Sequence, residues 1–382
     1  MARKMKDSGI EWIGEIPEGW EVVQLKRFAE VHNGREIDVE VDSTDSSAVG
    51  VYGSGGVFKY TNRAQYSGKA VLFGRKGTLG KPLYVEGQLW AVDTMYFLTY
   101  SNRLLEKFSY YQFLAFNWAP YITHTAIPSV VASEIVACYF PIPPLEEQAK
   151  IVDYLDNGCA SLDTILDKTR SSIEEYKKLK QAVITQAVTK GVRGKREMKD
   201  SGVEWIGEIP AEWSVAKAKY YVTITHGSDP KTEGSIPVYG SGAESFKTCG
   251  EYKEGPTVLI GRKGATLHIP HYIEGKYWNV DTAFDVKAKN NFSLPYYYYL
   301  ATSFDYKFYI AQTTLPGMTQ SNYYNMFLPL PTFPEQEEIV NYLDAKCAEI
   351  DGLIAKKEQL VRELESYKKS LIYEVVTGKR EV

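Results

Sequence analysis

The chain repeats itself, and this duplication constrains its fold more than any other feature of the sequence. The string MKDSGIEWIGEIP (Met5–Pro17) returns as MKDSGVEWIGEIP (Met198–Pro210), with Val203 in place of Ile10. Further along, VYGSG, Gly-Arg-Lys-Gly and W-x-V-D-T each occur twice, in the same order. Because self-similarity of this kind is typical of tandem structural units, we expect two copies of a unit of about 190 residues.

The ends of the chain resemble the junction between the two copies. The centre reads AVTKGVRGKREMKDSGVEW, the C-terminal end reads VVTGKREV and the N-terminal end reads MARKMKDSGIEW. Joining the two ends would nearly recreate the central junction. We therefore expect a ring-like, pseudo-twofold arrangement that is cut open at one place.

The first part of each copy, about residues 20–141 and 213–329, is rich in Gly, Tyr and β-branched residues. Short apolar runs such as KAVLFGRKG and PTVLIGRKG are typical of strands that end at glycine turns. The aromatic runs Lys107–Trp118 and Pro295–Phe304 occupy equivalent places and predict a buried helix. A base-stacking platform is the alternative, but helical spacing and apolar neighbours favour core packing.

The second part of each copy predicts a long helix. Pro143-Pro144 and Pro334 stand where proline is tolerated, at a first turn. The apolar residues that follow alternate at spacings of four and three, which is a heptad seam. Each helix should span roughly 45 residues, or about 65 Å, and the two should pack antiparallel and hold two globular domains apart. The seam residues are Ile151, Leu155, Leu162, Ile165, Leu179, Ile339, Leu343, Ile350, Leu353 and Leu364, with Leu360 and Tyr367 continuing the pattern.

These patterns predict an α+β fold with two tandem-duplicated domains in pseudo-twofold arrangement, separated by two long antiparallel coiled-coil helices. The expected boundaries are 1–142 for the N-terminal segment and first domain, and 143–196 for the central helix. Residues 197–331 repeat the segment and the domain, and 332–382 form the distal helix.

Composition excludes several classes of protein. A net charge of −4 argues against coating nucleic acid through bulk charge, although a reader with local basic residues stays possible. The 4 cysteines are far apart and form no CxxC pair, which favours buried thiols over disulfides or a zinc site. Without an apolar leader or a run of about 18 apolar residues, we expect a soluble, cytoplasmic protein with no membrane partner.

The repeated Gly-Arg-Lys-Gly loop is the main candidate for a binding site. A phosphate-binding loop needs four residues between its glycines, then Lys and Ser or Thr, and neither GRKGTLGKP nor GRKGATLHI fits. Arg can grip a guanine edge or a phosphate, and Lys can meet a phosphate. Our hypothesis is that Arg75, Lys76, Arg262 and Lys263 contact DNA, mostly as general contacts shared by both copies. The alternative is a solvated turn whose charges are matched by nearby carboxylates.

Polar positions around this loop are candidates for reading sequence, because Asn, Gln, Ser, Thr and His can address base edges. Two segments, Thr123–Glu134 and Gln312–Tyr324, share an apolar-Pro step but differ in their polar side chains. For any single residue an ordinary polar loop is about as good an interpretation. The candidates are Tyr52, Ser54, Thr125, Ser129, Tyr239, Ser241, Thr314 and Gln320.

No constellation of catalytic residues or metal ligands is evident in the sequence. Asp93 and Asp281 each follow a W-x-V string and are better interpreted as hydrogen-bonding turn residues than as catalytic acids. His268 and His271 lack an evident third ligand. We therefore expect no chemistry and no cofactor on this chain.

The strings DSGIEWIGEIPEGW, PIPPLEEQAKIVDYLD, PLPTFPEQEEIVNYLD, LKQAVITQAVTKG and SLIYEVVTGK together resemble the specificity subunits of type I restriction–modification systems. The resemblance covers the whole chain. It implies two target-recognition domains that each read half of a split site on double-stranded DNA, and long helices that dock two methyltransferase subunits. It also implies two restriction/translocase subunits, with S-adenosylmethionine, ATP and Mg on the partners.

Two other classes of function compete with this one. A standalone endonuclease would nick plasmid DNA alone in Mg²⁺, and the lack of a metal or cofactor constellation counts against it. A structural protein that binds protein or sugar would show no preference for DNA even with partner subunits.

Overall fold

The computed structural model describes residues 3–123, 125–242, 244–306, 309 and 317–382. The chain divides into two compact units, one formed by Met1–Thr169 with Gln359–Val382 and the other by Arg170–Glu358. Each unit therefore contains the hairpin and the sheet domain of one copy, the start of that copy's long helix and the end of the other copy's helix. We call residues 21–142 the first sheet domain and residues 214–330 the second sheet domain.

In the first unit, a small antiparallel hairpin precedes the sheet domain, and β3 pairs with β10. The main sheet has six strands in the order β4-β9-β7-β8-β5-β6. Its neighbouring strands are antiparallel except for β5 and β8, which are parallel. The strands are β1 (Met5–Asp7), β2 (Glu15–Pro17), β3 (Glu21–Gln24), β4 (Ala29–Asn33), β5 (Val49–Gly53), β6 (Gly56–Thr61), β7 (Tyr66–Gly74), β8 (Leu83–Ala91), β9 (Met95–Tyr100) and β10 (Tyr139–Ile142). The short helices are η1 (Leu25–Arg27), α1 (Glu106–Ala115), η2 (Ala119–Tyr121) and α2 (Ala132–Ala137).

The second unit repeats this plan with its sheet broken in two, in the orders β14-β21-β18-β19 and β16-β15-β20-β17. Gly255-Pro256 separates β17 from β18, where the first unit has the single strand β7; proline has no N–H to give to the ladder. The strands are β11 (Met198–Asp200), β12 (Glu208–Pro210), β13 (Ser214–Lys217), β14 (Val222–His226), β15 (Ile236–Tyr239), β16 (Ser245–Cys249), β17 (Lys253–Glu254), β18 (Thr257–Gly261), β19 (His271–Ile273), β20 (Lys276–Asn279), β21 (Ala283–Ala288) and β22 (Phe327–Leu330). The short helices are η3 (Ala218–Tyr220), α4 (Leu294–Ser303) and α5 (Gln320–Asn325).

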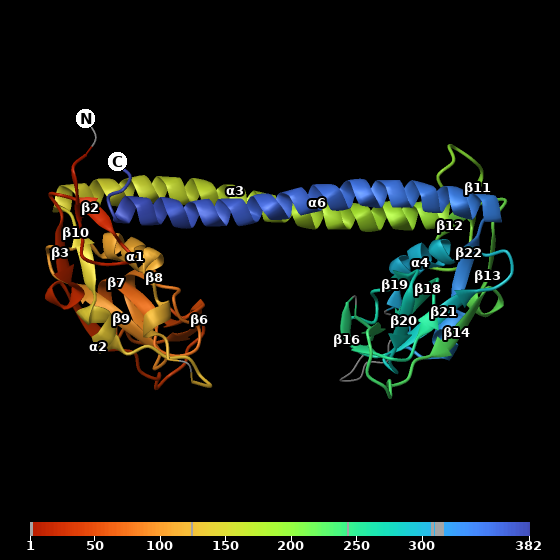
Figure 1. The fold of residues 1–382 in the computed structure, drawn as a ribbon, viewed down its shortest axis with the longest axis horizontal. Coiled ribbons are helices and arrows are strands. Elements are labelled where there is room, and N and C mark those ends of the chain that lie inside the picture. Colours follow the sequence, from red (N-terminus) through yellow and green to blue (C-terminus); the bar gives the residue numbers. More distant parts are fainter. Residues whose placement is uncertain (1–2, 124, 243, 307–308, 310–316) are drawn as a thin grey trace. The chain divides into compact units, whose positions relative to one another are not determined.

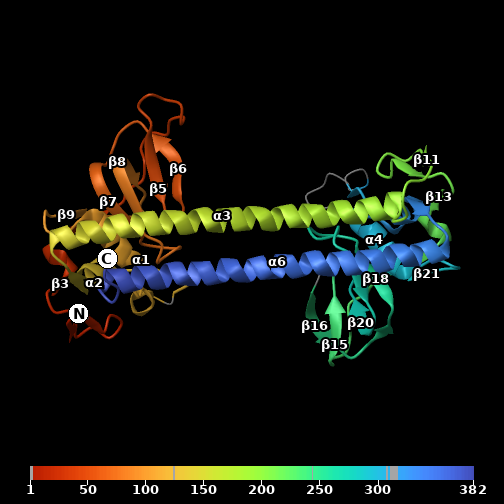
Figure 2. The same ribbon diagram turned by 90° about the horizontal axis from the view of Figure 1, so that it is seen from above.

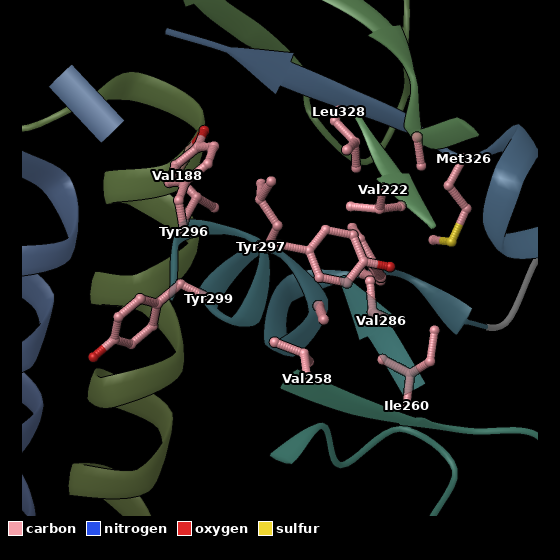
Figure 3. Close-up of a cluster of buried hydrophobic side chains, with 14 of the residues drawn as sticks. Val188, Val222, Val258, Ile260, Val286, Tyr296, Tyr297, Tyr299, Met326 and Leu328 are labelled. Atoms are coloured by element: carbon pink, nitrogen blue, oxygen red, sulfur yellow. The ribbon is translucent and has the colours of Figure 1, made fainter. Parts of the chain in front are cut away.

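The aromatic runs form core helices, as predicted. They are α1 and α4, and each packs between its sheet and a long helix. In Figure 3 the ring of Tyr297 lies among Val222, Val286 and Met326, whereas Tyr299 points away from that group. The Tyr299 hydroxyl donates to Asp344 at 2.6 Å, and its counterpart Tyr111 donates to Asp156 at 2.7 Å. Burial, not base stacking, therefore explains these aromatic residues.

The long helices are α3 (Leu145–Lys190) and α6 (Phe333–Val376), with 46 and 44 residues. They lie side by side in each unit (Figures 1 and 2). In the first unit Asp163 pairs with Lys368 at 2.6 Å, and a Cβ at Gly158 would lie 3.6 Å from Leu371. In the second unit Lys180 pairs with Asp351 at 2.6 Å, and Lys357 lies over the ring of Tyr176 at 5.6 Å. Residue numbers rise along one helix as they fall along the other, so the helices are antiparallel within each unit.

Part of the seam between the helices uses different residues from those predicted, displaced by one position along the helix. Ile165 is 46% exposed, whereas Leu166 is 4% exposed. Leu179 and Leu353 are exposed as well, and Leu364 is half-buried. The reason is that Cys159 and Cys347 occupy seam positions. The next seam residue then comes four residues after Leu162 and Ile350, at Leu166 and Ile354, and not three residues after them. The predicted seam residues that are buried are Ile151, Leu155, Leu162, Ile339, Leu343 and Ile350.

Candidate nucleic-acid interface

In each unit the backbone brings the repeated motifs together at one end of the sheet. In the first unit the amides of Arg75 and Lys76 donate to the carbonyl of Thr94 at 2.7 and 3.3 Å. The Val92 amide donates to the carbonyl of Tyr52 at 3.2 Å. The three motifs Y-G-S-G, Gly-Arg-Lys-Gly and W-x-V-D-T therefore meet at a single backbone junction.

The second unit repeats these bonds. The amides of Arg262 and Lys263 donate to the Thr282 carbonyl at 2.8 and 3.3 Å, and the Val280 amide donates to the Tyr239 carbonyl at 3.0 Å. Sequence repetition predicted equivalent loops, and the equivalence extends to individual hydrogen bonds. Asp93 and Asp281 thus belong to turns. In each turn the following threonine, Thr94 or Thr282, supplies the carbonyl that accepts both amides of the Arg-Lys pair.

Glycine is required for the shape of the Gly-Arg-Lys-Gly loop. A Cβ at Gly74 would lie 2.3 Å from the carbonyl oxygen of Thr78, and one at Gly261 would lie 2.2 Å from the Cα of Leu267. The closing glycines, Gly77 and Gly264, have φ of +80° and +112°, a region that side chains disfavour. The loop therefore holds its Arg-Lys pair in a fixed tight turn at the end of a buried strand.

A fourth segment, the apolar-Pro step, docks onto this loop. In the first unit the Val130 amide donates to the Arg75 carbonyl, and the Gly77 amide donates to the Pro128 carbonyl, both at 3.0 Å. In the second unit the Met318 amide donates to the Arg262 carbonyl at 2.8 Å. Isolated bridges pair Lys76 with Ser129 and Lys263 with Gly317. Ser129 and Gly317 are therefore structurally equivalent, and the two loops differ in side chain where their backbones agree.

The basic side chains are placed differently in the two copies. Arg75 is half-buried and lies over the ring of Tyr96 at 5.7 Å. Arg262 is held by Asp281, with Nη1 at 3.6 Å from a carboxylate oxygen and 3.1 Å from the backbone oxygen. Lys76 and Lys263 are exposed. The alternative of a charge-matched turn thus describes Arg262 in part, while the lysines face solvent.

The polar candidates in the Y-G-S-G motifs are half-buried. They are Tyr52, Ser54, Tyr239 and Ser241. Burial raises the pKa of Tyr52. The Ser241 hydroxyl lies 3.3 Å from that of Thr266, which follows the Gly-Arg-Lys-Gly loop, so the two motifs also meet through side chains.

The remaining candidates differ in how free their polar groups are. Thr125 is exposed, and its hydroxyl donates to the Ile127 carbonyl at 2.7 Å. The Ser129 hydroxyl lies 2.8 Å from that of Thr123. Gln320 donates its amide to the Ile224 carbonyl at 2.6 Å and so fastens α5 to β14. Thr314 lies outside the described residues.

Sequence reasoning missed two residues at this surface, Phe58 and Phe246. Both are exposed, and both follow the Y-G-S-G motif and precede a lysine. The repeated Phe-Lys pair was the available signal.

No group of three His, Cys, Asp or Glu side chains among the described residues could hold a metal ion. None of the helices in the described ranges is long and apolar enough to cross a membrane.

Comparison with known proteins identifies the family. A family model, the type I restriction modification DNA specificity domain, matches residues 17–175 and 215–362. The type I restriction enzyme MjaVIII specificity subunit of Methanocaldococcus jannaschii is 24% identical over 421 residues, covering 95% of this chain and 93% of that protein. A solved chain from work on assembly and conformational transition of the type I R-M system is similar in fold, with a TM-score of 0.72 at 16% identity, covering 96% of this chain and 99% of that one. The match in both halves shows that the chain belongs to the type I restriction–modification DNA specificity family, as a specificity subunit that is non-catalytic in itself.

Proposed function

We propose that each sheet domain reads one half of a split DNA target. The observation that carries this proposal is the duplicated junction, in which the same backbone hydrogen bonds hold Gly-Arg-Lys-Gly in both units. A shared scaffold with basic loops suits phosphate contacts that position a domain without reading sequence. Different side chains at equivalent places, such as Ser129 and Gly317, suit two half-sites of different sequence.

We propose further that the outer faces of α3 and α6 dock two methyltransferase subunits and, in the complete complex, two restriction subunits. Each unit exposes apolar side chains on these helices, and contiguous exposed apolar surface is typical of protein-binding sites. They are Tyr154, Ile165, Leu360 and Tyr367 in the first unit, and Leu179, Tyr342 and Leu353 in the second. We call these residues the outer stripe.

The outer stripe repeats with the duplication, which supports one methyltransferase per unit. Tyr154 and Tyr342 occupy the same place in the aligned strings IVDYLD and IVNYLD. At the same spacing Ile165 matches Leu353, and Leu179 matches Tyr367. Only Leu360 lacks an apolar counterpart, since Ser172 stands at its matching place. Both helices are continuous, so a gap of fixed length between the half-sites is the expected consequence.

The test is single-molecule sequencing of adenine methylation in a host that expresses this chain with its methyltransferase. We expect one split motif with a constant gap, absent from a host that lacks this chain. Exchanging the second sheet domain for that of a relative should change one half of the motif and leave the other half intact. If both halves change, or if the complex assembles without producing a motif, the proposal is wrong.

A further inference from the structure

Phe58 and Phe246 are exposed aromatic residues at equivalent places in the two sheet domains. Their exposed fractions are 57% and 60%, and each is followed by a lysine, Lys59 or Lys247. An exposed large apolar residue is ordinary when it occurs once. The same exposed Phe-Lys pair in both copies requires a common explanation.

Each of the two phenylalanines lies at a β-bulge. In the first domain Tyr52 pairs with Val57 and Val51 pairs with Lys59, so Phe58 is the extra residue of β6. In the second, Tyr239 pairs with Ser245 and Val238 pairs with Lys247, so Phe246 is the extra residue of β16. A bulge re-aims a side chain and occurs often beside functional sites. In both domains, therefore, a β-bulge directs a phenylalanine side chain outward.

Both rings lie against the junction of the repeated motifs. A Cβ at Gly53 would be 3.3 Å from the Phe58 ring, and one at Gly240 would be 3.7 Å from the Phe246 ring and 3.0 Å from the Thr282 hydroxyl. In the first domain Phe58 lines a cleft of about 540 Å³ together with Glu36, Asp93 and Thr94. Since Thr94 accepts the amides of Arg75 and Lys76, the ring shares a surface with the Gly-Arg-Lys-Gly loop.

Ion pairs neutralise part of the charge around Phe58. Lys59 pairs with Glu40 at 2.7 Å, and Arg63 pairs with Asp38. In the second domain Lys247 lies 5.5 Å from the ring of Phe246. An apolar ring in a charge-paired setting suits the apolar surface of a DNA groove, such as a thymine methyl group, better than it suits a phosphate.

We propose that Phe58 and Phe246 pack against bases in the DNA groove, one in each half-site, while the neighbouring Gly-Arg-Lys-Gly loops meet the backbone. This inference rests on the proposed reading of one half-site by each sheet domain. The two residues add affinity by excluding water from apolar surface, a contribution that does not release counterions. Their effect should therefore be independent of salt, unlike that of the basic loop.

The experiment measures binding of the assembled chain–methyltransferase complex to duplex DNA that carries the methylated motif, between 50 and 300 mM KCl as an approximate range. Phe58→Ala and Phe246→Ala should each weaken binding about tenfold at every salt concentration, as expected for removing a half-exposed ring that becomes buried. Phe58→Leu should lose less. The double variant R75A/K76A should instead flatten the dependence of affinity on salt.

Tyr220→Ala is the matched control. Tyr220 is 58% exposed but precedes the start of β14, whereas the Gly-Arg-Lys-Gly loop lies at the other end of that sheet, where Gly261 pairs with Ala283. The proposal is overturned if the two alanine variants bind like the parent, if they flatten the salt dependence, or if they lose binding only because the methyltransferase no longer assembles. A parent complex that gives no split motif would contradict the proposed function instead.

Discussion

At the scale of single residues, the two sheet domains fill one core position with different chemistry. In the second domain the Asp285 carboxylate is buried, pairs with Lys253 and accepts the Thr225 hydroxyl at 2.5 Å. Thr225 and Asp285 are opposite each other in the pairing of β14 with β21. The corresponding pair in the first domain is His32 and Phe97, whose rings stack 4.7 Å apart. The duplicated backbone thus accepts either an ion pair or an aromatic stack.

Breaking this ion pair should destabilise the second unit. Asp285→Asn leaves the ammonium of Lys253 without its counter-charge, and such a change costs about 3 kcal/mol when the pair is buried. The doubly apolar variant Lys253→Met/Asp285→Leu should recover most of the loss, since no unpaired charge remains. Calorimetry with urea titration checks both. If Asp285→Asn and the parent have equal free energies of unfolding, the ion pair contributes nothing to stability.

His271 should make the second unit less stable in mild acid. Burial lowers the pKa of His271, and its Nε2 has no hydrogen-bond partner among the described residues. The unfolded chain therefore binds the proton more readily than the folded chain does. The stability contributed by the neutral ring is complete above about pH 6.5, the ordinary pKa of histidine. It is lost as the pH falls toward the lower pKa that His271 has in the folded state. The first domain has Leu83 at the matching register position.

The variant His271→Leu tests this assignment. Its unfolding midpoint should change less between about pH 7.5 and 5.5 than that of the parent. Phe97→Leu in the other domain controls for a general effect of core substitution. If the parent and His271→Leu lose stability in parallel, another group controls the acid response.

Residue roles were only partly predictable from sequence. Repetition pointed to the Gly-Arg-Lys-Gly loop because both copies have the same four residues. It did not indicate that Gln320 bonds a strand carbonyl, nor that a bulge exposes Phe58. The first fact depends on how α5 packs on β14. The second depends on strand register, which the hydrophobic pattern of so short a strand does not fix.

At the scale of elements, the long helices were the most predictable part of the chain. Sustained heptad spacing and flanking prolines predicted two helices of nearly the observed length. The phase of the seam failed at Ile165 and Leu353, because Cys159 and Cys347 pack as small apolar residues. The error is informative, since it leaves two large aliphatic residues facing outward on the helices.

A charge placed on the outer stripe should prevent assembly without unfolding the chain. Ile165→Glu puts a carboxylate where we propose that a methyltransferase packs, and Glu is a good helix former. We expect loss of one methyltransferase from the complex, as measured by native mass spectrometry, with an unchanged unfolding temperature. Leu353→Glu should do the same in the second unit.

Thr164→Glu adds the same charge to the neighbouring exposed position and serves as the control. It should leave assembly intact. If Ile165→Glu and Leu353→Glu also assemble fully, the outer stripe is not the docking surface.

At the scale of the whole molecule, each unit is completed by a helix that belongs to the other copy's segment of the chain. In the first unit the hairpin covers the end of α6, where the Tyr373 hydroxyl donates to the carbonyls of Trp12 and Ile13 at 3.0 and 3.2 Å. A Cβ at Gly378 would lie 2.4 Å from Pro17. In the second unit the equivalent hairpin shares a core with the end of α3, since Ile206, Ile209 and Val188 belong to the same buried cluster.

We therefore expect the hairpin to require a helix end to pack on, whichever chain segment connects the two. In the second unit a short linker leads from Gly191 to Met198; it is exposed at Gly194 and Lys195 and anchored where Arg196 pairs with Glu335. A glycine in the left-handed region follows each long helix, Gly191 with φ +73° and Gly378 with φ +72°. A linker of the same sequence, placed between Gly378 and Met5, should join the end of α6 to the first hairpin equally well. Exposed loop tips of this kind tolerate a change in connectivity.

A circular permutant that is opened between Gly194 and Lys195, with its original ends joined by the sequence of the central linker, should fold and direct methylation of the same split motif as the parent. The control permutant is opened between Val71 and Leu72, inside β7, where the strand pairs with β8 on one side and with β9 on the other, and it should fail to fold. Unfolding temperature and methylation sequencing measure the two properties separately. If the permutant opened at Gly194 aggregates, the native order of segments is needed for folding. If it folds but its motif has a new gap, the linker sets the separation of the half-sites, and the long helices alone do not.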